Sequence, residues 1–117
     1  MQLDVSHLEP GQLPLASVSG EVDVYSAPAL RDGLSELLST GSSVIVDLTE
    51  VGFLDSTGLG ALVAARKVAE DNGAQLPLVC VKERILKLFT ITGLDGVFTI
   101  HGSVADAQQA LAAADPS

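Results

Sequence analysis

The residues with the most chemical potential lie in one short segment, residues 55–60, which reads DSTGLG. This segment follows an apolar run and leads into a stretch with helical spacing. A serine at such a junction, here Ser56, can accept hydrogen bonds from the unpaired N–H groups of the first helical turn. The same place also suits a phosphate, because the helix dipole and the free amides favour negative charge there. From spacing alone, Ser56 is either a helix cap or a phosphoacceptor.

Enzyme chemistry fits this segment poorly. The sequence has no G-x-x-x-x-G-K-[ST] motif, and Val63 stands where a G-x-G-x-x-G loop would need its third glycine. Ser56 is not part of a G-x-S-x-G motif. The two histidines, His7 and His101, lie far away in strand-like stretches, so neither is an obvious base for the serine. We therefore expect no catalytic residues and no enzyme activity.

Metal and cofactor sites are not indicated either. No group of cysteines and histidines has the spacing of metal ligands. Asp23, Asp47 and Asp55 could at most form a hypothetical Mg²⁺ cluster, and the simpler prediction is that each caps a turn. We expect neither a metal nor a cofactor on this chain.

The composition narrows the class of protein. The chain has 117 residues, which is room for a single domain, and 47% are hydrophobic, enough for a core without disulfides. The net charge of −9 repels phosphate backbones and anionic lipid heads, so we expect no nucleic acid and no direct membrane binding. The single cysteine, Cys80, lies in an apolar run and is predicted to be a buried core residue. Without a secretory signal or a membrane-spanning run, a cytoplasmic monomer is expected.

The elements that must position Ser56 follow from turn signals and periodicity. Residues 3–7 and 13–18 predict a hairpin, and residues 43–48 predict a buried strand that is followed by a short apolar loop. Ser26 is the expected cap of a helix with leucines at helical spacing from Leu30 to Leu38. A second helix is predicted from Ser56 to about residue 72, with residues 72–73 (NG) as its left-handed cap.

The rest of the chain alternates in the same way. A strand over 75–81 contains Pro77, which fits only at an edge, at a bulge or among the first residues of a strand. A short helix ending at Gly93, a strand over 97–100 and a helix opened by Ser103 complete the chain, with residues 112–117 as a flexible tail. This order predicts an α/β fold, one mixed β-sheet of about five strands with about four helices, in a single domain over residues 1–117.

Four pieces of the sequence form one pattern. They are GEVD at residues 20–23 after the hairpin, VIVDL at 44–48, FLDSTGLG at 53–60, and the stretch from Leu88-Phe89 to the TGL of residues 92–94. Together they resemble the STAS domain family, in particular the stand-alone bacterial anti-sigma factor antagonists. The resemblance extends from about Leu3 to Leu111 and is most specific in the DSTGLG core.

The resemblance implies a regulatory role in transcription and stress response. Members of this family bind an anti-sigma factor, itself a serine/threonine kinase, and so release a sigma factor. The family's phosphoacceptor is the serine after the aspartate, which corresponds to Ser56, with Thr57 as the lesser candidate. The kinase uses Mg-ATP, and a PP2C-type phosphatase reverses the modification. Asp23, Asp55 and residues 56–60 (Ser56, Thr57, Gly58, Leu59 and Gly60) would then belong to the partner-binding surface.

A phosphate on Ser56 would act at an interface rather than on the fold. It adds about −1.5 to −2 charges beside Asp55, yet at a helix N-terminus it is locally favourable. We therefore expect the unphosphorylated surface to bind the kinase and the phosphorylated surface to be repelled. The alternative is a STAS subunit of another complex, a lipid-transport ATPase or a stressosome, without a sigma-factor partner.

Overall fold

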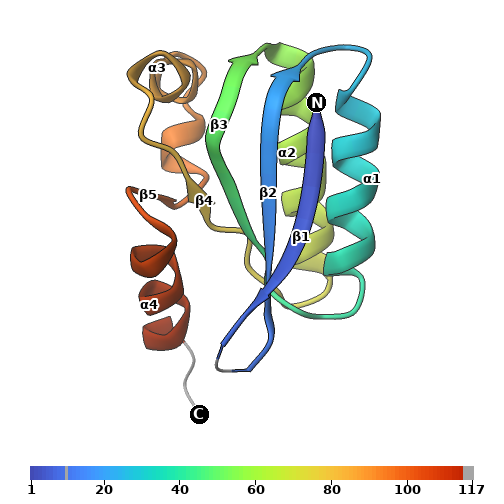
Figure 1. The fold of residues 1–117 in the computed structure, drawn as a ribbon, viewed down its shortest axis with the longest axis vertical. Coiled ribbons are helices and arrows are strands. Elements are labelled where there is room, and N and C mark those ends of the chain that lie inside the picture. The colour runs from blue at the N-terminus through green and yellow to red at the C-terminus, as the bar shows by residue number, and fades with distance from the viewer. Residues whose placement is uncertain (10, 115–117) are drawn as a thin grey trace.

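A computed structural model describes residues 1–9 and 11–114 of the chain. The strands and helices alternate along the chain after an N-terminal hairpin (Figure 1). In chain order they are β1 (Gln2–Leu8), β2 (Leu13–Val22), α1 (Ala27–Leu38), β3 (Ile45–Leu54), α2 (Ser56–Asp71), β4 (Leu78–Val79), α3 (Glu83–Ile91), the 3₁₀ turn η1 (Leu94–Gly96), β5 (Ile100–His101) and α4 (Val104–Ala114).

The five strands form one mixed sheet in the order β1-β2-β3-β4-β5. β1 pairs with β2 in antiparallel fashion, and all later pairs are parallel. The register places Val22 opposite Leu54, so β2 and β3 end at the same edge of the sheet. The expected α/β fold with a hairpin and alternating strands and helices is confirmed.

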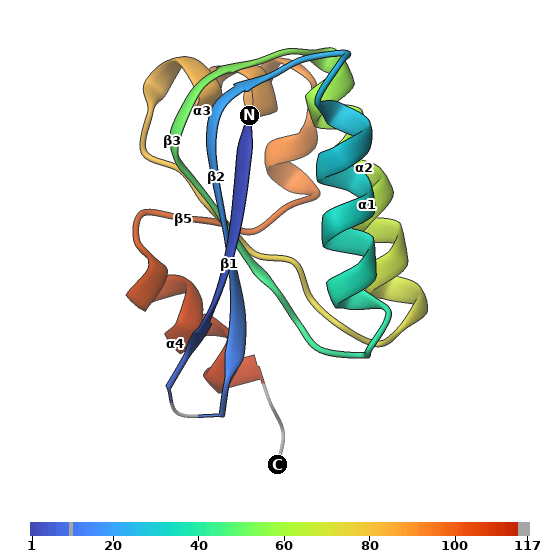
Figure 2. The same cartoon turned by 45° about the vertical axis from the view of Figure 1, so that its right-hand side comes forward.

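The helices divide between the two faces of the sheet. α1 and α2 lie side by side on one face, and α4 lies on the other (Figure 2). Leu30, Leu34 and Leu38 of α1 recur at helical spacing and are fully buried. The smaller cluster under α4 is centred on Ile45, Val79 and Ala107. The larger core therefore fixes α1 and α2 against β2 and β3, the two strands that carry the segment around Ser56.

Several boundaries differ from the prediction. The expected loop after residue 48 continues as a strand up to Leu54, and this strand pairs with β2 through two register shifts and buries every third residue, at Leu48, Val51 and Leu54. β4 and β5 are only two residues long each, and the turn η1 was not predicted. Pro77 directly precedes the short β4, as its missing N–H requires. Residues 112–114, assigned to a flexible tail, belong to α4, and residues 115–117 lie outside the described residues.

Two predicted helix boundaries are confirmed. α2 ends at Asp71 with Asn72 as its C-cap, and Gly73 follows with a φ of 67°, the left-handed conformation that favours glycine. Ser103 precedes α4, and its hydroxyl accepts a hydrogen bond from the N–H of Asp106 at 3.1 Å.

Cys80 is a core residue, as predicted, with a residual exposure of 3%. Burial raises the pKa of its thiol, and the thiolate is the reactive form. We expect alkylation of Cys80 by iodoacetamide to be at least roughly tenfold slower in the folded protein than in urea. Mass spectrometry of timed samples measures this rate. Equal rates in the two conditions would show that the segment around Cys80 opens freely.

No helix within residues 1–9 and 11–114 combines the length and the apolar character that a membrane crossing requires.

Candidate functional site

Ser56 is the first residue of α2, and Asp55 takes the capping position before it. Asp55 has extended backbone angles, and its carboxylate accepts hydrogen bonds from the N–H groups of Thr57 at 3.0 Å and Gly58 at 3.1 Å. Of the two alternatives for Ser56, the helix cap is therefore wrong. Ser56 is exposed, and its hydroxyl has no hydrogen-bond partner among the described residues. The serine oxygen is thus left available for chemistry.

Thr57 differs from Ser56 although both are exposed. Its hydroxyl donates a hydrogen bond to the same carboxylate oxygen of Asp55 that receives the two backbone N–H groups. Asp55 therefore holds one hydroxyl of this segment and leaves the other free.

The bond from the Thr57 hydroxyl, followed by those from the backbone, lowers the pKa of Asp55 below 3.8. A carboxylate whose pKa is lowered by folding stabilises the protein fully above its unfolded value, and loses that contribution as the pH falls through the lowered value. We expect the difference in unfolding free energy between the wild type and Asp55→Asn to shrink as the pH falls below 3.8. Urea unfolding at several pH values measures it. A difference that stays constant with pH would contradict the ionised cap.

Gly58 fixes where the first turn of α2 lies. A Cβ at this position would be 2.4 Å from Cδ1 of Leu54, 2.9 Å from Cγ1 of Val22 and 3.3 Å from the carbonyl oxygen of Val22. The N–H of Asp55 also donates to that carbonyl at 3.3 Å. The absent side chain therefore lets α2 begin directly against the ends of β2 and β3.

The loop after β2 lies at this same edge of the sheet and is organised by Asp23. Its carboxylate accepts hydrogen bonds from the N–H groups of Tyr25 at 3.0 Å and Ser26 at 3.1 Å. The hydroxyl of Ser26 lies within hydrogen-bond distance of Asp23 and of the carbonyl of Glu21, and makes no cap bond to α1. The predicted N-cap position of Ser26 is confirmed, with its hydroxyl bound to the loop rather than to the first turn of α1.

The three aspartates do not converge on a metal. Asp23 and Asp55 organise turns, and Asp47 accepts hydrogen bonds from the N–H and hydroxyl of Thr49. Within the described residues, no group of three or more histidine, cysteine or acidic side chains could hold a metal ion. The simpler prediction, that each aspartate caps a turn, is confirmed for Asp23 and Asp55 and wrong for Asp47, which lies within β3.

The histidines are not brought to Ser56. His7 pairs with Pro14 near the start of β2, at the end of the sheet opposite Ser56. His101 is in register with Val79 and, through it, with Asp47 near the start of β3. The arrangement therefore offers Ser56 no imidazole base.

The remaining predicted surface residues divide by burial. Gly58 is buried and Leu59 is 4% exposed in the core, so the expectation of direct partner contact does not fit them. Gly60 is exposed, and a Cβ there would meet no atom within 4 Å. Gly60 and Thr57 line a hollow of about 320 Å³ between α1 and α2. The exposed part of the predicted site is therefore Ser56, Thr57 and Gly60, with Asp23 and Asp55 half-buried beside it.

Sequence reasoning missed three apolar side chains on this surface. Tyr25 is 91% exposed, Val24 57% and Phe53 48%. Val24 and Tyr25 follow Asp23 in the loop after β2, and Phe53 is near the end of β3. Val24 and Tyr25 could have been found from the sequence, because they are two adjacent apolar residues inside a predicted turn, where no core position is available. Exposed apolar side chains around an unpaired serine hydroxyl are suited to bind a protein partner.

Comparison with known proteins finds relatives over most of the chain. The family model described as STAS domain matches residues 9–107. An anti-sigma-B factor antagonist of Bacillus subtilis is 42% identical over 84 residues, which is 72% of this chain and 77% of the relative. One from Staphylococcus aureus is 33% identical over 102 residues, covering 86% and 94%. The solved structure of an anti-sigma factor antagonist from Mycobacterium paratuberculosis superposes with a TM-score of 0.80 at 26% identity, covering 93% of each chain.

Proposed function

This chain belongs to the STAS domain family, and from that membership we propose that it is an anti-sigma factor antagonist. In this proposal its unphosphorylated form binds an anti-sigma factor that is a serine/threonine kinase, and the sigma factor is released. The relatives at 33–42% identity are named anti-sigma-B factor antagonists, which are regulatory proteins and not enzymes. The observation that supports the switch is the exposed hydroxyl of Ser56, which has no hydrogen-bond partner within residues 1–9 and 11–114.

Ser56 is the phosphoacceptor of this proposal. Asp55 caps α2 in its place, so the Ser56 hydroxyl forms no hydrogen bond within the described residues. A kinase can therefore phosphorylate this hydroxyl without breaking a hydrogen bond of the fold. The hydroxyl of Thr57 donates to Asp55 and would have to leave it first. This difference supports Ser56 as the acceptor and Thr57 as the lesser candidate.

The phosphate would change a surface rather than the fold. It adds about −1.5 to −2 charges at the start of α2, where the helix dipole favours negative charge. It also adds charge beside the Asp55 carboxylate and near the exposed side chain of Val24, which lines the same hollow as Thr57. A partner that packs against these side chains would have to desolvate the phosphate, which disfavours binding.

The nucleotide and the other enzymes belong to the partners. Mg-ATP is bound by the kinase, and this chain needs no cofactor for its role. A PP2C-type phosphatase returns Ser56 to the free hydroxyl. The exchange takes place in the cytoplasm, where sigma factors meet RNA polymerase.

The test is phosphosite mapping after incubation of the purified protein with lysate of its own host and Mg-ATP. We expect one phosphate, on Ser56, and none on Ser56→Ala. Thr57→Val is the matched variant, and it should still be modified at Ser56. An unmodified wild type, in a lysate active on a control substrate, would refute the switch and favour a constitutive STAS subunit of another complex.

A further inference from the structure

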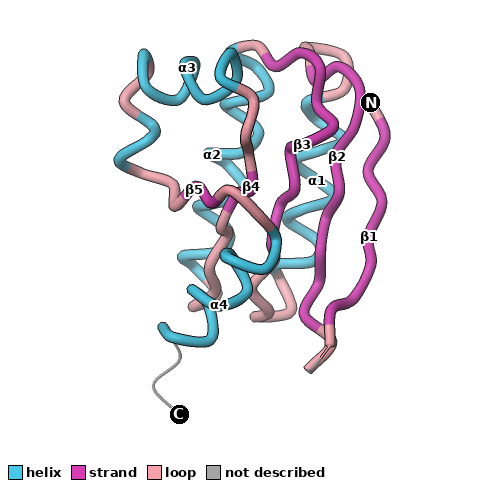
Figure 3. The backbone as a smooth tube through the Cα atoms, turned by 60° about the vertical axis from the view of Figure 1, so that its left-hand side comes forward, coloured by secondary structure: helices cyan, strands magenta, loops and turns pink. Residues whose placement is uncertain are grey.

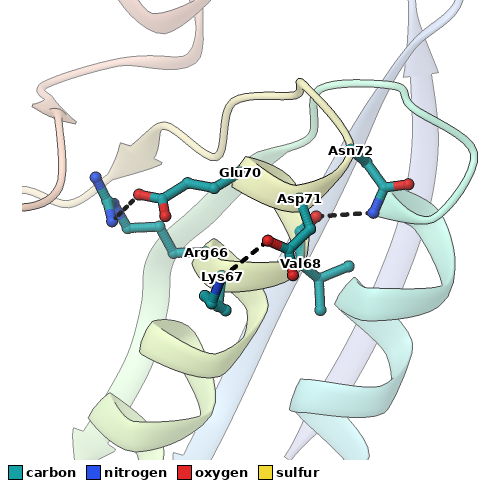
Figure 4. Close-up of polar contacts among 6 residues, drawn as sticks. All are labelled: Arg66, Lys67, Val68, Glu70, Asp71 and Asn72. Atoms are coloured by element: carbon teal, nitrogen blue, oxygen red, sulfur yellow. Dashed lines mark hydrogen bonds and ion pairs between the residues drawn. The ribbon is translucent and has the colours of Figure 1, made fainter.

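The positive charges of this acidic chain are unevenly placed. It has six Lys and Arg residues for a net charge of −9. Three of them are paired with neighbouring carboxylates, Arg31 with Asp32, Arg66 with Glu70 and Lys67 with Asp71. Figure 4 shows the last two pairs on the C-terminal turns of α2, beside the bond from Asn72 to the carbonyl of Val68. The positive charge of each of these three residues is thus compensated by a nearby carboxylate.

The other three cations lie together at α3. Lys82, Arg84 and Lys87 are exposed, and none forms an ion pair within the described part of the chain. The one carboxylate among them is Glu83, in the first turn of α3. Half of the chain's positive charge thus occupies six consecutive residues, without compensation by a salt bridge.

Two of these cations join α3 to the end of β3. The ammonium of Lys82 donates to the carbonyl of Val51 at 2.8 Å, and the guanidinium of Arg84 donates to the carbonyl of Gly52 at 3.1 Å. A lysine has three N–H donors and an arginine five, so most of their donors remain for another acceptor. The two side chains are therefore held in position while most of their hydrogen-bonding capacity is unused.

An apolar hollow lies next to these cations. It measures about 230 Å³ and is lined by Phe53, Leu54, Arg84, Ile85 and Leu88. α3 and the end of β3 stand side by side at the end of the sheet where α2 begins (Figure 3). The hollow lies near the start of α2, since its lining residue Leu54 is two residues before Ser56. We call Phe53, Lys82, Arg84, Lys87 and Leu88 the α3 edge.

We propose that the α3 edge is a docking surface for an acidic segment that carries one bulky apolar side chain, on the same protein that contacts Ser56. The proposal rests on the proposed function for the identity of that protein. Charge complementarity determines the kind of segment, because carboxylates are attracted to unpaired cations and repelled by most of this chain. The hollow beside Arg84 accepts the apolar side chain, and the two contacts together fix the orientation of the partner.

The first test uses a synthetic peptide as the probe. A short peptide in which glutamates flank one phenylalanine is titrated into the ¹⁵N-labelled full chain and followed by NMR, and its counterpart has glutamines in place of the glutamates. We expect the acidic peptide to shift the amide signals of the α3 edge and to bind more weakly as salt is added. Lys87→Glu should weaken it by roughly fivefold, as expected for one exposed charge pair. Lys67→Glu, the same charge change on α2, should not.

Three results would overturn the docking surface. These are no binding of the acidic peptide, equal binding of the two peptides, and shifts located away from the α3 edge. A second measurement tests whether the partner is the kinase: the initial rate of Ser56 phosphorylation in host lysate should fall for Lys87→Glu and not for Lys67→Glu. Equal rates for both variants, with Ser56 still modified, refute the shared partner alone. No modification of the wild type refutes the proposed function instead, whatever the peptide does.

Discussion

Replacing Gly58 by alanine is expected to destabilise the protein by about 1–3 kcal/mol, the range for overpacking a buried position. The new methyl group would stand 2.4 Å from Leu54 and 2.9 Å from Val22, both of them core residues. The carbonyl of Val22 at 3.3 Å limits how far the helix can shift in response. Alanine's better helix propensity, about 1 kcal/mol, offsets only part of this effect.

Gly60→Ala is the matched control, because it makes the same chemical change two residues later in the same helix. A Cβ at Gly60 meets no atom within 4 Å, so the propensity gain should stand alone and raise stability by up to about 1 kcal/mol. Urea unfolding of the two variants measures both effects. Two variants that shift stability in the same direction would show that α2 is not held against β2 and β3 as described.

Ser56→Asp is expected to weaken binding of the anti-sigma factor by roughly tenfold or more, since like charge and desolvation act together at an interface. The variant brings one charge, where a phosphate brings nearly two. Ser56→Ala should bind like the wild type and remain bound when Mg-ATP is added, because it has no hydroxyl to modify. Calorimetric titration with the kinase that modifies Ser56 measures both variants.

Ser103→Asp provides the matched control for this charge. Ser103 also precedes a helix, and an aspartate can replace it as a cap, so the same charge is added away from Ser56. This variant should bind like the wild type. A Ser56→Ala variant that is folded and yet fails to bind would show that the hydroxyl itself is part of the interface, and the repulsion mechanism would lose its basis.

The sequence predicted the order of elements well and left the N-terminal cap of α2 undecided. Periodicity identified α1 and α2 because burial repeats along a helix face. The NG of residues 72–73 predicted the end of α2 because Gly73 adopts the left-handed conformation that terminates a helix. Ser56, the cap alternative that is wrong, directly follows Asp55, whose carboxylate caps α2 instead. Either oxygen could reach the same N–H groups, and the extended backbone at Asp55 decides between them. That backbone angle depends on where β3 ends, which was expected six residues too early.

The sequence predicted only those residues of the candidate surface that lie within one short segment of the chain. Ser56 and Thr57 were found from the DSTGLG segment, whereas the exposure of Tyr25 and Phe53 depends on which neighbours cover them. Likewise, nothing local shows that Lys82 reaches the carbonyl of Val51, 31 residues earlier in the chain. Salt-bridge pairing and exposure are properties of the tertiary structure, so they cannot be predicted from the periodicity of the sequence.

Because the strands differ in length, the half of the sheet formed by β2 and β3 and the half formed by β4 and β5 should differ in their rates of amide hydrogen exchange. β2 and β3 have ten residues each and pair along most of their length, whereas β4 and β5 are joined by two residue pairs. Amides in β4 and β5 should therefore exchange with deuterium through local opening, and those in β2 and β3 only when the whole domain unfolds. Ser56 follows β3, in the half of the sheet that should exchange slowly, and α3 follows β4, in the half that should exchange faster. A rigid segment and a more mobile segment therefore lie next to each other on one surface.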